Sequence, residues 1–231
     1  MKEVLSYLWG TSQKSDGQMS VYSDDVSVEN RKIFFKKLGL DPGKIVLAGL
    51  SHSSNVDLVG EESIGQKINN TDGLITNVPG IILTITSADC LPIFFFDKNK
   101  EVIGLAHAGW RGVESNIVSK VIEKMRSKFG SNPKDITVNI GPHIKSCHFE
   151  IKDDLVEKFS QYKDFITTSD GVTNLDLSAI VREQLKDCGV NPDSINISSE
   201  CTYCLPDKYY SFRRDKPEKV EVMVSYSVMG N

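Results

Sequence analysis

Two short motifs place metal-capable side chains directly beside apolar runs. The motif SADCLP at residues 87–92 contains Cys90, and the motif LAHAGWRG at residues 105–112 contains His107. Thiolate and imidazole are ligands that suit zinc, and three protein ligands with a fourth position left to water is the arrangement of catalytic zinc sites. The two motifs therefore predict part of a zinc site that needs a third protein ligand.

Three other histidines compete for the third position. His52 follows a short apolar run in LAGLSHSSNVD and turns into a polar loop, so it is the favoured ligand. His143 and His148 flank Cys147 in GPHIKSCHFE, and this local cluster could bind a metal by itself. A further C-x-x-C pair, Cys201 and Cys204, has no second pair at zinc-finger spacing, so it is interpreted as thiols that are buried or line the site.

Two neighbours of these ligands suggest further chemistry. Asp89 precedes Cys90 and is a candidate proton carrier. Arg111 lies in the turn before a helix expected over residues 113–129, where backbone N–H groups, the helix dipole and a guanidinium favour an anion. The sequence therefore predicts a bound phosphate near the metal.

The elements that must position these residues follow from hydrophobic patterning. Apolar and β-branched runs predict strands, and apolar stripes that end at glycine predict helices. The strands are expected over 44–50, 81–86, 92–97, 102–107, 136–141 and 194–199, and the helices over 27–38, 113–129, 153–162 and 176–188. This interleaving predicts an α/β (α+β) fold, a mixed-sheet sandwich with helices outside, as one domain over 1–231, but it does not give the strand order or the oligomeric state.

Composition excludes several classes of protein. The chain has 231 residues, 39% of them hydrophobic and 25% charged, with a net charge of -4 and no run of Lys or Arg, so no nucleic-acid partner is expected. The first residues lack the apolar core of a signal peptide, and no stretch approaches the ~20 apolar residues of a membrane span. We therefore expect no membrane partner and a cytoplasmic location, with the five cysteines as thiols.

Four segments together resemble one known family. They are TDGLITNVPGIILTITSADCLPIFFFD, VIGLAHAGWRGV, IGPHIKSCHFEI and ECTYCLPDKYYSFRRD, and they occur in the family's order between about residues 24 and 215. The family is variously called polyphenol-oxidase or laccase-domain proteins, peptidoglycan editing factor and zinc-dependent purine nucleoside phosphorylase. The pairing of ADCLP with HAGWRG is the most specific part of the resemblance.

The resemblance implies a site and an activity. The zinc ligands would fall on His52, Cys90 and His107. The substrates would be a purine nucleoside and phosphate, with phosphorolysis of adenosine, inosine and methylthioadenosine and an accompanying adenosine deaminase activity. The fold would be shared with a group of cysteine-dependent toxins. Candidate substrate- or phosphate-binding residues at family positions are Arg31, Arg111, Arg213 and Arg214, and Asp72 also matches.

The chain departs from the family pattern at three places. Leu50-Ser51-His52-Ser53 replaces the usual Gln-Val-His-Gly around the first ligand. GTSQKSDGQMS replaces a Ser-Thr-Arg followed by paired glycines, so a basic group is missing, and His143 stands where the family commonly lacks a histidine. These departures bear on substrate range more than on metal binding.

Other functions predict different requirements. A copper phenol oxidase needs more histidines than the four present, although the ligand types also suit copper. An amidase that edits peptidoglycan precursors would use Cys90 as nucleophile and His107 as base. A zinc-stabilised binding module would need a closed four-ligand site, and the spacing along the chain does not reveal one.

Overall fold

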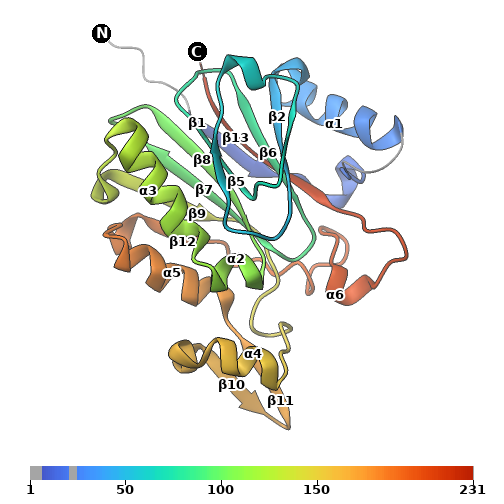
Figure 1. Ribbon diagram of the computed structural model, residues 1–231. Coiled ribbons are helices and arrows are strands. Elements are labelled where there is room, and N and C mark those ends of the chain that lie inside the picture. Colours follow the sequence, from blue (N-terminus) through green and yellow to red (C-terminus); the bar gives the residue numbers. More distant parts are fainter. Residues whose placement is uncertain (1–6, 21–24, 231) are drawn as a thin grey trace.

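A computed structural model of the protein describes residues 7–20 and 25–230. Two β-sheets pack face to face, and helices cover their outer faces (Figure 1). The mixed α/β fold expected from the sequence is thereby confirmed.

The five-stranded sheet has the order β1-β13-β6-β2-β4. Its strands are β1 (Tyr7–Thr11), β13 (Met223–Met229), β6 (Ile82–Ser87), β2 (Ile45–Gly49) and β4 (Lys67–Asn69). β13 pairs antiparallel with β1 and β6, whereas β2 is parallel to β6 and β4. The first and last described strands of the chain are therefore neighbours in this sheet.

The six-stranded sheet has the order β12-β9-β7-β8-β5-β3. Its strands are β12 (Ile195–Ile197), β9 (Ile136–Ile140), β7 (Leu91–Asp97), β8 (Val102–Ala108), β5 (Gly73–Thr76) and β3 (Val56–Leu58). The chain passes from β6 of the first sheet to β7 of the second through only Ala88, Asp89 and Cys90. Both sheets therefore meet at the motif that carries the cysteine.

The three longest helices lie on the outer faces of the sheets, and the described residues form six α-helices in all (Figure 1). They are α1 (Asp25–Lys37), α2 (Trp110–Glu114), α3 (Ile117–Phe129), α4 (Asp153–Lys158), α5 (Leu177–Asp187) and α6 (Phe212–Asp215), with 3-10 turns at Lys14–Asp16, Pro42–Lys44, Glu61–Ser63, Pro133–Asp135, Ser160–Phe165 and Pro192–Ser194. A hairpin of β10 (Ile166–Ser169) and β11 (Val172–Leu175) projects with α4 beyond the sheets (Figure 1). None of the helices in the described residues has the length and apolar character needed to cross a membrane.

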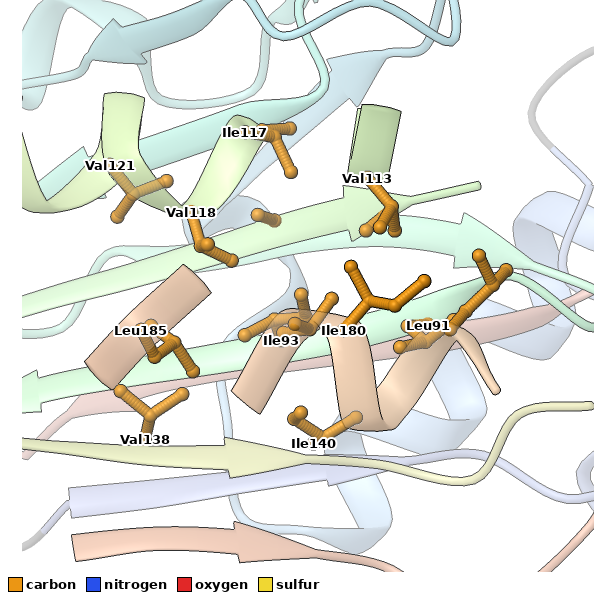
Figure 2. Close-up of a cluster of buried hydrophobic side chains, with 14 of the residues drawn as sticks. Leu91, Ile93, Val113, Ile117, Val118, Val121, Val138, Ile140, Ile180 and Leu185 are labelled. Atoms are coloured by element: carbon orange, nitrogen blue, oxygen red, sulfur yellow. The ribbon is translucent and has the colours of Figure 1, made fainter. Parts of the chain in front are cut away.

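Alternation along β7 explains how one strand serves two layers. Ile93 and Phe95 join the cluster beneath α3 and α5, whereas Phe94 joins the cluster between the sheets. Figure 2 shows Val118 and Val121 of α3 with other side chains of the first cluster. Because successive side chains of a strand face opposite ways, a nearly continuous apolar run marks a strand buried on both faces.

The helix expected over residues 113–129 is interrupted. The chain forms the short α2 and then α3, because Asn116 takes a left-handed conformation at φ 54° and its side chain caps Ser119 N at 3.2 Å. The expected link between Arg111 and the start of the long helix is therefore wrong, since Arg111 belongs to the five-residue α2. The apolar stripe does not reveal this break, because it continues across it: Val113 before the break and Ile117 after it are both buried.

Candidate metal site

Cys90 is positioned by a turn that crosses between the two sheets. It follows Asp89, whose φ of 91° is unusual for a residue with a side chain, and it directly precedes Leu91, the first residue of β7. The Asp89 carboxylate accepts hydrogen bonds from Thr202 Oγ1 at 2.6 Å, Ser211 Oγ at 3.0 Å and the Arg213 backbone N–H at 2.7 Å. These contacts hold the strained turn and fix the direction in which Cys90 leaves it.

His107 lies on β8, the neighbour of β7. It stands opposite Pro92 in the antiparallel register, so its position is two residues along β7 from Cys90. Its side chain is 3% exposed, and its Nδ1 lies 2.9 Å from Asp72 Oδ1. With Nδ1 engaged by the carboxylate, Nε2 is the nitrogen left for a ligand role.

The third residue, His52, comes from a loop that Asp72 holds in place. The fully buried Asp72 carboxylate accepts backbone N–H bonds from Ser51, His52 and Ser53 at 3.1, 3.0 and 2.8 Å. The hydroxyls of Ser51 and Ser53 donate to it at 3.1 and 2.9 Å. One carboxylate therefore sets both the His52 loop, with φ 57° at His52, and the His107 ring.

The three residues favoured by the sequence come together. One donor atom from each of His52, Cys90 and His107 lies within 4.8 Å of the others, and the two imidazole rings meet edge to face with centroids 5.0 Å apart. A Cβ at Gly109 would lie 3.0 Å from Cys90 Sγ and 3.4 Å from His52 Cδ2, so only glycine leaves this space open. The donor set, the fixed His107 nitrogen and the space suit a zinc ion.

Electrostatic interactions favour a negatively charged Cys90 thiolate beside a positively charged His107 imidazolium. Burial alone would raise the pKa of Cys90, but the charge of His107 and hydrogen bonds from both histidines lower it to about 6. Burial would lower the pKa of His107, but the Cys90 thiolate and Asp72 raise it to about 9. Burial opposes ionisation of Asp72 as well, yet bonds from His107 and the Ser53 backbone hold its pKa well below the usual range.

The candidate arginines occupy different environments. Arg31 on α1 donates to Met19 O at 2.8 Å and Ser20 O at 2.6 Å, and Arg213 donates to Glu150 O at 2.9 Å and His148 O at 3.4 Å. Arg214 donates to the carbonyls of Thr202, Tyr203 and Tyr209 and pairs with Asp215. The exposed Arg111 guanidinium lies 4.2 Å from the Trp110 ring and makes no hydrogen bond among the described residues.

The rival cluster around Cys147 is divided by the fold. His143 is fully buried and its Nδ1 lies 2.7 Å from Gly141 O, whereas Cys147 and His148 meet Cys201 and Cys204. The sequence contains no second C-x-x-C pair, so cysteine spacing did not predict these partners. An adjacent Cys-His pair placed more than fifty residues earlier in the chain leaves no spacing signal.

Comparison with known proteins places the chain in a family. Residues 13–226 match the family model described as multi-copper polyphenol oxidoreductase laccase, and the chain belongs to this family. It is 31% identical to purine nucleoside phosphorylase YlmD of Bacillus subtilis, over 93% of this chain and 83% of that protein. It is 33% identical to a purine nucleoside phosphorylase of Clostridium acetobutylicum, over 72% and 71% of the two chains.

Solved structures agree with the fold. A hypothetical protein YfiH of Bacillus licheniformis has a TM-score of 0.91 and 28% identity, covering 96% of this chain and 92% of that one. YlmD of Geobacillus stearothermophilus has a TM-score of 0.87 and 27% identity, covering 98% and 92%. The family resemblance stated from the motifs is thus confirmed.

Proposed function

We propose that this protein is a zinc-dependent purine nucleoside phosphorylase. The observation that carries the proposal is the convergence of His52, Cys90 and His107 around the open space at Gly109, supported by relatives named purine nucleoside phosphorylases. In the reaction a phosphate oxygen attacks C1′ of the ribose and the bond to the base breaks. The electron pair passes to the base nitrogen, which gains a proton, and free base and ribose 1-phosphate leave.

The three proposed ligands, His52, Cys90 and His107, together form what is called the strand-end site. A zinc ion held there by His52, Cys90 and His107 would supply a Lewis acid. His107 is oriented by Asp72, and exposed His52 borders solvent, so substrate approaches from the His52 side. Asp89 holds the Cys90 turn through its three hydrogen bonds, and we propose this positioning role for it in place of proton transfer.

Phosphate recognition is assigned to Arg111. Its guanidinium is the one among the four candidate arginines that is not directed at backbone carbonyls within the described residues. Stacking on Trp110 restricts the guanidinium without using its donors, so the donors stay available for an anion. Arg31, Arg213 and Arg214 instead secure loops around the fold.

The same site is proposed to deaminate adenosine when phosphate is absent. Purified protein of known zinc content should then convert adenosine to inosine without phosphate and release base from inosine or methylthioadenosine only with phosphate. His107→Ala should abolish both reactions, whereas Cys188→Ser, which lies outside the site, should keep both. Base release that is independent of phosphate would reject phosphorolysis.

A second function is favoured by one observation. A thiolate at Cys90 beside a protonated His107 and Asp72 is also the arrangement of a cysteine hydrolase, and it fits an amidase. The two functions differ in their need for metal. Removing zinc with a chelator should end nucleoside turnover, whereas an amidase should survive chelation and lose activity on alkylation of Cys90.

A further inference from the structure

A second group of metal-capable side chains lies outside the strand-end site. Cys147, His148, Cys201 and Cys204, here called the turn cluster, each offer one donor atom within 4.8 Å of the others. Cys147 Sγ lies 3.8 Å from Cys201 Sγ and 3.7 Å from Cys204 Sγ. His148 Nδ1 lies 3.2 Å from Cys147 Sγ and 3.3 Å from Cys204 Sγ.

These distances match the edges of a tetrahedron around zinc. A Zn–S bond of ~2.3 Å and a tetrahedral angle put two sulfurs ~3.8 Å apart, and a Zn–N bond of ~2.0 Å puts sulfur and nitrogen ~3.5 Å apart. The two sulfur separations from Cys147 agree with this geometry, and the two separations from His148 Nδ1 to sulfur are a few tenths of an ångström shorter. Four donors of the types Cys₃His complete the coordination shell of a structural zinc ion.

The backbone prepares the cluster in the manner of a metal-binding turn. The Cys147-His148 turn is closed by bonds from His148 N and Phe149 N to Lys145 O at 3.0 and 2.9 Å. The C-x-x-C turn is closed by Leu205 N to Cys201 O at 3.2 Å. Lys145 N also donates to Cys201 Sγ at 3.5 Å, and such a donor stabilises a sulfur ligand in its ionised form.

The His148 ring is also held in place by an aromatic neighbour. It stacks on Tyr203, with centroids 3.9 Å apart and planes at 15°, and Tyr203 lies between the two cysteines of the C-x-x-C turn. An isolated β-bridge between His143 and Cys201, with Thr202 N donating to His143 O at 3.1 Å, joins the two segments directly. The cluster is thus built by tertiary structure and does not depend on one flexible loop.

We propose that the turn cluster is a structural zinc site, closed by four protein ligands and separate from the strand-end site. Three cysteine sulfurs favour zinc over hard cations such as magnesium or calcium, because soft thiolate ligands select zinc whereas hard cations prefer oxygen. The ion would join the Cys147 turn to the Cys201 turn. Thr202, next to Cys201, bonds to Asp89 and so couples this joint to the turn that carries Cys90.

Metal analysis of variants tests the proposal without reference to activity. Protein purified under reducing conditions and loaded with Zn²⁺ should hold two zinc ions per chain, one of them at this cluster. Cys204→Ser and Cys147→Ser should each lose one equivalent, and Cys90→Ala should lose the other. Cys188→Ser, which changes a half-buried cysteine outside both groups, should keep the full content.

The outcomes separate the two sites. Unchanged zinc in Cys204→Ser and Cys147→Ser would overturn the structural site and leave the strand-end site standing. Unchanged zinc in Cys90→Ala would overturn the strand-end site and leave the turn cluster standing. A Cys147–Cys204 disulfide in the reduced, Zn²⁺-loaded protein would also overturn the proposal, because it would consume two of the four ligands.

A spectrum of the unaltered chain guards against variants that fail to fold. Co²⁺ loaded in place of zinc should give a thiolate charge-transfer band, about three-quarters of which comes from the three thiolates of the turn cluster and the rest from Cys90. Titration with Co²⁺ should show two steps of unequal intensity. A single step with the intensity of one thiolate would contradict the proposal.

Discussion

The two Cys/His groups differ in the structure that carries them. The strand-end site takes its proposed ligands from a strand, a crossing turn and a loop, and one buried carboxylate, Asp72, positions two of the three. The turn cluster takes its proposed ligands from two tight turns, and within the described residues no carboxylate is hydrogen-bonded to their side chains. Three ligands beside an open space at Gly109 suit catalysis, whereas four ligands leave no position for substrate.

Because the two groups differ in this way, losing a ligand should have a different effect at each of them. Loss of a ligand at the strand-end site should remove activity while the sheets, whose cores lie elsewhere, stay packed. Loss of a ligand at the turn cluster should weaken the joint between two chain segments. Activity and stability are therefore the two measurements that distinguish the groups.

The largest effect is expected at Asp72. Asp72→Asn presents amide hydrogens to donors that need an acceptor, so zinc affinity at the strand-end site should fall about 10–100-fold and the free energy of unfolding by about 3 kcal/mol. Asp97→Asn is the matched control, because Asp97 is equally buried but, among the described residues, its side chain accepts bonds only from Asn99 N and Lys100 N. Zinc titration and denaturant unfolding measure both quantities. Equal losses of zinc affinity and of unfolding free energy in the two variants would contradict a specific role of Asp72 in positioning the ligands.

The contrast between the groups is sharpened by comparing Cys204→Ser with Cys90→Ala. Cys204→Ser should lower the thermal midpoint by about 5–10 °C, since the joining ion is lost. Nucleoside turnover measured well below the midpoint should remain. Cys90→Ala should show the opposite pattern. A loss of activity in Cys204→Ser without loss of stability would break the comparison.

The fourth histidine belongs to neither group and gives a pH test. Burial, followed by the charge of Lys145, lowers the pKa of His143 to about 4 from an ordinary value of 6.5. The unfolded chain therefore binds this proton first as pH falls from 6.5 to 4, and the protein loses stability over that window, about 2 kcal/mol by pH 5. His143→Asn should remove this part of the pH dependence in denaturant unfolding. An unchanged slope would reject the assignment.

The smallest effect is expected at Arg111. Arg111→Ala should raise the KM for phosphate about tenfold, because one pair of charge-assisted hydrogen-bond donors is lost. The zinc content should stay unchanged. Arg182→Ala, which removes an exposed arginine from α5, is the control and should leave the KM unchanged. An unchanged phosphate KM in Arg111→Ala would show that another residue binds the phosphate.

Sequence patterning predicted the strands beside the site but not their assembly. β6, β7 and β8 were foreseen because apolar runs mark strands buried on both faces, and Cys90 and His107 were placed at their ends. The sequence did not predict β1, β3, β4, β5, β10, β11 and β13. The partition of β6 and β7 into different sheets has no local signal. The distinct role of Asp72 also depends on long-range contacts, since its partners lie 19 to 35 residues away in the chain.

We propose that the strand-end site, and not the turn cluster, cleaves nucleosides with phosphate. The direct measurement is the initial rate of hypoxanthine release from inosine against phosphate concentration, with zinc content determined for wild type, Cys90→Ala and Cys204→Ser. In wild type and Cys204→Ser, base release should saturate with phosphate and form ribose 1-phosphate, whereas Cys90→Ala should release no base. Full phosphate-dependent release by a folded Cys90→Ala variant lacking zinc at the strand-end site would contradict it.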